Sequence, residues 1–212
     1  MKAELFYVHD PMCSWCWGFT EVAKHLFSVL PESVTVRRLL GGLAADNDQP
    51  MPMVQQKSIQ ENWLRIENTI PGMKFNFDFW AVCQPRRSTY PACRAVIAAR
   101  KQGDEYDEAM TFRIQQAYYE EARNPSDNET LIQLAGELGL DQRQFSRDFL
   151  AESCQQALLN EVSLSRDMHA DSFPSLIFKS GDTARPVAID YLDAFPMLAL
   201  IEMFLEMEEE TK

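Results

Sequence analysis

The chain has no long apolar run and comparatively few basic residues. Across its 212 residues, 32 acidic side chains outnumber 20 lysines and arginines, which gives a formal net charge of −12 at pH 7. Repulsion from phosphate groups opposes binding to nucleic acids and to anionic membranes, so neither is an expected partner. No apolar stretch reaches the roughly 18 residues that a membrane-spanning helix needs. The first strand-like run starts at about residue 3 and leaves no space for a signal peptide, so we expect a cytoplasmic protein.

Residues that ligate metals are also scarce, with three histidines and five cysteines. His9 lies four residues before Cys13, but no second Cys-x-x-Cys pair and no histidine pair follows. Because a structural zinc site needs four ligands, we expect no metal, and no organic cofactor is required. Cys154 is expected to pack in a helix, while Cys83 and Cys93 are either core or free thiols or a second redox pair.

What the sequence does contain is a pair of cysteines three positions apart, within Asp-Pro-Met-Cys-Ser-Trp-Cys-Trp-Gly-Phe at residues 10–19. On a helix, such positions lie one turn apart on one face, so the two sulfurs can form a disulfide with little backbone movement. Cys13 is predicted at the helix N-terminus, where unpaired amides and the helix dipole favour a thiolate by up to ~2 kcal/mol. We therefore predict that Cys13 is the nucleophile and that Cys16 is its partner one turn inside.

The position of this pair strengthens the interpretation. Residues 2–9 are nearly continuously apolar and predict a buried strand, residues 16–30 have helical periodicity, and residues 34–40 predict a second strand. A Cys-x-x-Cys pair beside a βαβ unit in an intracellular chain is typical of thioredoxin-like redox proteins. The predicted fold class is therefore α/β, with a thioredoxin-like fold and an inserted helical subdomain.

The end of the chain meets the other requirements of that fold. Pro174, at the start of the apolar run at residues 175–178, is predicted to be a cis-proline that faces the thiols. The backbone around it would be free to pair with an extended peptide. A hairpin up to residue 189 and a helix over residues 194–209 would complete the fold.

The middle of the chain predicts helices instead of strands. We assign residues 46–169 to an inserted helical subdomain of five or six helices, and residues 1–45 and 170–212 to the thioredoxin-like domain.

Some local expectations within this subdomain are specific. Phenylalanines alternate with polar residues between Met73 and Trp80, which predicts an extended segment. Ser126 with Glu129, and Asp141 with Gln144, are predicted to form capping boxes at the starts of two helices.

With these residues assembled, the chain resembles the DsbA-like thiol oxidoreductases, and most closely their cytoplasmic FrnE-type subgroup. The resemblance extends over nearly the whole chain and implies that Cys13 attacks, that Cys16 resolves and that Pro174 is the cis-proline. Two differences bear on the chemistry. The pair Ser14-Trp15 stands in place of the Pro-His of strongly oxidising periplasmic members, and Phe173 is bulkier than the valine or threonine usual before the cis-proline.

Four residues are predicted to bind substrate or to tune the thiols: Ser14, Trp15, Phe173 and His9. Trp15 is expected to lie between the thiols at an exposed turn. His9 either tunes Cys13 or simply ends the first strand. Arg86 and Arg87 form a solvated loop or hold an acidic group of the substrate.

The predicted activity is protein disulfide oxidoreduction by thiol–disulfide exchange, in the reductase, oxidase or isomerase direction. The expected partners are protein or small-molecule thiols and disulfides, glutathione among them. Two alternatives stay open. One is a glutathione-dependent transferase or isomerase similar to the kappa class, which by resemblance has serine where Cys13 stands. The other is a non-enzymatic chaperone or partner-binding module.

Overall fold

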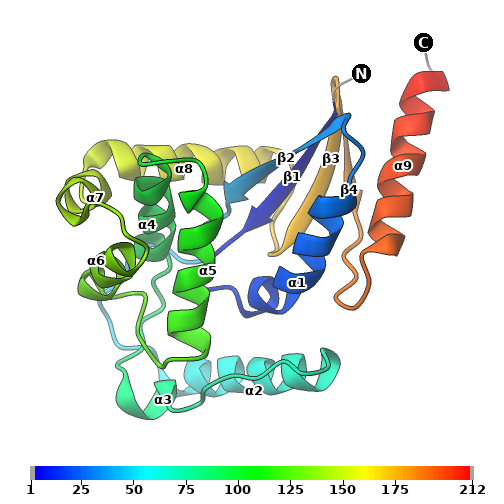
Figure 1. Cartoon of the computed structure of the whole chain (residues 1–212). Helices are drawn as coiled ribbons and strands as arrows, with labels where there is room; N and C mark the ends of the chain where they lie inside the picture. Colours follow the sequence, from blue (N-terminus) through cyan, green and yellow to red (C-terminus); the bar gives the residue numbers. More distant parts are fainter. Residues whose placement is uncertain (1–2, 211–212) are drawn as a thin grey trace.

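The computed structural model describes residues 3–210, including the side chains of residues 3–208. Its sheet has the strand order β2-β1-β3-β4 (Figure 1). The strands are β1 (Ala3–His9), β2 (Val34–Leu40), β3 (Ser175–Ser180) and β4 (Thr183–Val187). β1 runs parallel to β2 and antiparallel to β3, and β3 pairs with β4 as a hairpin. Lys2, which the predicted first strand included, lies outside the described residues.

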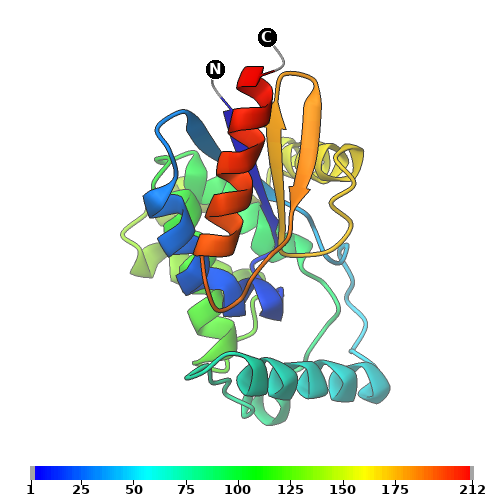
Figure 2. The ribbon, with the colours of Figure 1, turned by 90° about the vertical axis from the view of Figure 1, so that its right-hand side faces the viewer.

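Helices α1 (Ser14–Val29) and α9 (Phe195–Glu210) cover one face of this sheet (Figure 2). Successive side chains of a strand point to opposite faces. Leu5 and Tyr7 of β1 accordingly join the core beneath α1 and α9, whereas Phe6 and Val8 belong to a smaller core on the other face. Burial on both faces explains why the first strand is apolar without alternation.

Between β2 and β3 the chain forms seven helices within the fully described residues 53–167, and not the five or six that the sequence predicted. They are α2 (Met53–Thr69), α3 (Phe79–Val82), α4 (Tyr90–Arg100), α5 (Tyr106–Tyr119), α6 (Asn128–Glu137), α7 (Gln142–Phe149) and α8 (Glu152–Asp167). Their core also includes Met12 and Trp17 from the cysteine region. The helical part is thus packed directly onto the start of α1, while its treatment as a separate subdomain of residues 46–169 stays a prediction. No helix in the described part of the chain is long and apolar enough to cross a membrane.

The prediction of an extended segment between Met73 and Trp80 is wrong. The chain passes through a loop and a turn and then enters the short helix α3. The alternating aromatic rings pack around the buried Trp63, whose ring is stacked on Phe75 at 4.9 Å and meets Phe77 edge-on at 5.5 Å. The period of two therefore reflects aromatic packing and not a strand.

One of the two predicted capping boxes is also wrong. The first residue outside α6 is Asp127, and the Ser126 hydroxyl donates to the carbonyl of Ser88 at 2.8 Å instead of capping the helix. By contrast, Asp141 is the N-cap of α7, where its carboxylate accepts from the amides of Arg143 and Gln144 at 2.8 and 2.9 Å.

Candidate active site

The two cysteines of the motif lie at the start of α1, as expected from their position after β1. Cys13 is the extended N-cap residue, and its Sγ accepts a hydrogen bond from the amide of Cys16 at 3.3 Å. Both are free thiols. Cys13 keeps 7% of its surface exposed, whereas Cys16 is fully buried. An incoming sulfur therefore meets Cys13 first.

The environment of Cys16 is that of a thiol kept protonated. Burial is the main cause that raises the pKa of Cys16 well above its ordinary value. A hydrogen bond to Cys13 and the charge of the same residue raise that pKa further, because two negative charges on neighbouring sulfurs repel each other. The sulfur of Cys13 is thus the more accessible of the two, and the sulfur of Cys16 behind it stays protonated.

The loop before β3 faces this pair. The peptide bond between Phe173 and Pro174 is cis, and Pro174 is buried. The thiol of Cys13 donates to the Phe173 carbonyl at 3.2 Å, a contact between residues 160 positions apart. The structure therefore brings together Cys13, Cys16, Phe173 and Pro174.

The ring of Phe173 packs against Gly41, the residue that follows β2. A Cβ atom added to Gly41 would lie 2.0 Å from Cε1 of the Phe173 ring, so the ring occupies the space that any other side chain would need. The ring belongs to the smaller core on the face of the sheet opposite α1. The absent side chain of Gly41 thus allows Phe173 to position its carbonyl against Cys13.

Asn62 of α2 holds both residues between the cysteines. Its Nδ2 donates to Ser14 Oγ at 2.8 Å, and its Oδ1 accepts from the indole N–H of Trp15 at 3.0 Å. On the other side, the ring of Trp15 packs against Tyr191 at 4.7 Å between centroids. Sequence reasoning missed Asn62 and Tyr191, since nothing in their local sequence indicates that they approach the motif.

Asp10 belongs to the motif, but the sequence analysis assigned it no role. Its fully buried carboxylate accepts from the amides of Met12 at 2.8 Å and Leu43 at 2.7 Å, and from the hydroxyl of Thr89 at 2.6 Å. Burial raises the pKa of Asp10, against the opposing effect of these hydrogen bonds. Asp10 therefore links three segments: the turn that contains Cys13, the loop after β2 and the loop before α4.

His9 ends β1, and within residues 3–208 no hydrogen bond joins its ring to either sulfur. Its ring is stacked on Tyr7 at 4.8 Å, and among the described residues neither ring nitrogen has a hydrogen-bond partner. Burial, with smaller effects from Arg38 and Arg100, lowers the pKa of His9 well below its ordinary value. A role of His9 in tuning Cys13 stays a prediction.

The remaining cysteines are free thiols, and each donates a hydrogen bond to an oxygen of a residue distant in sequence. Cys83 and Cys154 donate to the carbonyls of Ala122 and Arg94 at 3.1 and 3.4 Å. Cys93 donates to Asp10 at 3.5 Å, so it lies behind the turn that carries Cys13.

A cavity of about 350 Å³ opens beside Cys13. Its wall includes Trp15 and Phe173, together with Arg65 of α2 and Arg87 of the loop before α4. The size is at the lower end of the range for small-molecule sites. Cys13 therefore borders a space whose wall includes aromatic rings and two arginines.

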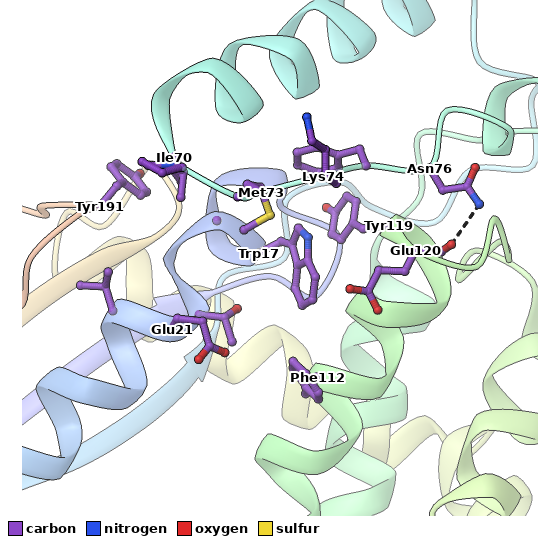
Figure 3. A pocket seen from close by; sticks show the side chains of 16 residues that line it. Trp17, Glu21, Ile70, Met73, Lys74, Asn76, Phe112, Tyr119, Glu120 and Tyr191 are labelled. Carbon is purple, nitrogen blue, oxygen red and sulfur yellow. Dashed lines mark hydrogen bonds between the residues drawn. The ribbon is translucent and has the colours of Figure 1, made fainter.

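A larger cavity of about 740 Å³ is lined in part by residues 17–22 of α1 (Figure 3). Aromatic side chains dominate its lining, with Trp17, Phe112, Tyr119 and Tyr191 among them. Tyr191 lines this cavity and also contacts Trp15 of the motif. A second, separate hollow thus begins at Trp17 of the motif, and Arg87 is not part of its lining.

Comparison with known proteins agrees with this arrangement. A candidate protein disulfide isomerase from Nitrosomonas europaea is 26% identical and superposes with a TM-score of 0.85, covering 98% of this chain and 99% of that one. The cytosolic disulfide reductase DsbM from Pseudomonas aeruginosa is 25% identical with a TM-score of 0.75, covering 96% and 99%, and has also been solved with GSH.

The ClpXP adapter protein SpxH from Bacillus subtilis is 26% identical over 177 residues, which are 82% of this chain and 58% of that protein. The chain thus spans less than two thirds of the length of this curated relative. A family model described as thioredoxin matches residues 6–190, from the first strand to beyond the last. With a four-stranded sheet, the thiol pair at the start of α1 and an α/β fold shared with these oxidoreductases, the chain belongs to the thioredoxin family.

Proposed function

We propose that the protein is a disulfide oxidoreductase that exchanges thiols and disulfides through Cys13 and Cys16. The observation that carries the proposal is the unequal environment of the two sulfurs. Cys13 accepts an amide hydrogen bond at the rim of a cavity, and Cys16 lies fully buried one helical turn behind it. Thiol–disulfide exchange needs this difference, because one thiol attacks the substrate first and the second thiol reacts only after the mixed disulfide has formed.

In the reducing direction, the Cys13 thiolate attacks one sulfur of a substrate disulfide. A bond forms between Cys13 and that sulfur, the substrate S–S bond breaks, and the released half leaves as a thiolate that takes a proton from water. Cys16 then loses its proton and attacks the Cys13 sulfur. The Cys13–Cys16 disulfide forms, the second half of the substrate leaves, and two electrons have passed from the protein to the substrate.

The reverse sequence would oxidise a substrate dithiol, and one of the similar proteins supports the reducing direction. The neighbour at 25% identity is named a cytosolic disulfide reductase and has been solved with GSH. We therefore propose reduction in a cytoplasmic setting, with glutathione among the thiols that react with Cys13. Membership of the FrnE-type subgroup stays a prediction.

The test is a pair of serine substitutions with a matched control. We expect Cys13→Ser to abolish disulfide reduction, and Cys16→Ser to accumulate a mixed disulfide on Cys13, which intact-mass measurement detects. Cys154→Ser removes a free thiol of α8 far from the motif and should change neither result. Normal turnover by either motif variant would disprove the assigned roles.

A second candidate is a partner-binding adapter in which the thiols are not needed. The names of the curated relatives favour it, since they are ClpXP adapter proteins at 25% and 26% identity. A Cys13→Ser/Cys16→Ser double variant that keeps full partner binding in pull-down assays would support this function. A kappa-class transferase is less well supported, because that class has serine where this chain has Cys13.

A further inference from the structure

Arg87 differs from the other half-buried arginines of the protein. It lines the cavity beside Cys13, and within residues 3–208 its side chain makes no ion pair and no hydrogen bond. Every other half-buried arginine in that range pairs with a carboxylate. These are Arg38, Arg86, Arg94, Arg100, Arg113, Arg123 and Arg185. In a chain with a net charge of −12, an unpaired half-buried cation marks a place for an anion from outside.

Arg86, the neighbour of Arg87 in the loop before α4, points its side chain to a different part of the protein. Arg86 pairs with Asp127 and donates to the carbonyl of Ser126 at 2.7 Å, on the side of α6. Of the pair at positions 86 and 87, only Arg87 lines the cavity with Cys13. The sequence left open whether the pair is a solvated loop or a substrate contact, and the structure divides the two roles.

The loop that carries Arg87 is tied directly to the turn that carries Cys13. Thr89, two residues later, donates its hydroxyl to Asp10 at 2.6 Å, and the same carboxylate accepts from the amide of Met12 at 2.8 Å. The backbone that carries Arg87 is thus anchored to the turn of Cys13 before any ligand arrives. Such preorganisation reduces the entropy cost of binding.

The charges around the cavity favour an anion near Arg87. Arg65 is a second, exposed arginine on its wall, and Glu61 is the one acidic residue in the lining. The positive charge of Arg87 lowers the pKa of the neighbouring Tyr118 against the larger effect of burial. The guanidinium therefore acts on the buried wall of the cavity and not only on solvent.

We propose that Arg87 forms a carboxylate-binding subsite beside Cys13 and selects acidic thiols and disulfides as substrates. The inference rests on the proposed function and names its substrate class. A planar guanidinium binds a carboxylate through two parallel N–H···O bonds, which fixes the direction from which the substrate sulfur approaches Cys13. A neutral disulfide of similar reactivity gains nothing from this contact.

The kinetic test compares two disulfides in the same variants. We expect Arg87→Gln to lower the ratio of kcat/KM for oxidised glutathione to kcat/KM for hydroxyethyl disulfide by roughly 10-fold or more, as expected for a lost charge-assisted hydrogen bond. Arg87→Lys keeps the charge without the planar fork and should give an intermediate ratio. Arg166→Gln removes an exposed arginine of α8 without an ion pair in the described residues and should leave the ratio unchanged. Equal losses on both disulfides would overturn the subsite.

A binding measurement separates failure of the subsite from failure of the proposed activity. S-methylglutathione carries the same carboxylates but no thiol, so it cannot exchange with Cys13. Calorimetric titration should give a dissociation constant roughly 10-fold higher for Arg87→Gln than for the unmodified protein. Such a difference would support the subsite even if neither disulfide were reduced. The absence of binding to the unmodified protein, or equal binding to both, would overturn it.

Discussion

Replacing Gly41 by alanine is expected to disturb the loop that faces Cys13. Gly41 follows β2, and its amide donates to the carbonyl of His9 at 2.8 Å. The added Cβ would lie 2.0 Å from Cε1 and 2.2 Å from Cζ of Phe173. Gly41 is not among the glycines with positive φ, so alanine suits the backbone and the effect would be purely steric.

The size of the effect follows from the two ways in which the clash can be relieved. If the ring stays in place and the backbone shifts, the cost is that of overpacking, about 1–3 kcal/mol. If the half-buried ring swings into solvent, roughly half of a phenylalanine's burial is lost, which is about 1 kcal/mol. Either way we expect at least ~1 kcal/mol of destabilisation, together with slower exchange because the Phe173 carbonyl contacts Cys13.

A double-mutant cycle makes this expectation specific to the Gly41–Phe173 contact. Urea unfolding of the reduced protein would be measured for Gly41→Ala, Phe173→Val and the combination. We expect the combination to be more stable than the sum of the single effects by at least ~0.5 kcal/mol, since the smaller side chain makes room for the new methyl group. Additive effects, or a Gly41→Ala variant as stable as the parent, would refute the reasoning.

Three further expectations concern groups around the thiols. His9→Phe should raise the free energy of unfolding at pH 7 by about 1–3 kcal/mol by removing two unpartnered nitrogens. Because burial lowers the folded pKa of His9, protonation of its ring disfavours the folded state, so the parent protein loses stability as pH falls from the unfolded value of about 6.5 through the folded value. Urea unfolding at pH 5 and 7.5 should show less acid sensitivity in the variant. For Asp10, whose folded pKa is raised, the stability difference between the parent and Asp10→Asn should be largest below about pH 4 and shrink as pH rises through the folded value. A difference that grows with pH would contradict this sign. Asn62→Ala leaves Trp15 and Ser14 without their partner, and should cost about 1–3 kcal/mol in the same assay.

The predictions for residues 73–80 and for Ser126 are wrong because each sequence pattern has more than one physical cause. Alternating phenylalanines between Met73 and Trp80 satisfied the period of a strand. In the structure they surround Trp63, and the amide of Asn76 donates to the carbonyl of Tyr119 at 2.7 Å instead of to a neighbouring strand. Ser126 likewise has the right type and spacing for a cap, but its hydroxyl is used by Ser88. In both cases a partner distant in sequence decided the outcome.

Features that depend on neighbouring residues could be predicted from the sequence: a buried strand, a helix that starts at Cys13, a second thiol one turn later and a proline before a late strand. These follow from periodicity and from local backbone geometry. The folded structure was needed to show that Thr89 meets Asp10 across 79 positions and that Asn62 meets Trp15 across 47. It also decided that Arg87, and not Arg86, would face Cys13. The physical reason is that each such contact depends on the path of the intervening helices, which packing of the whole core determines and no short stretch of sequence encodes.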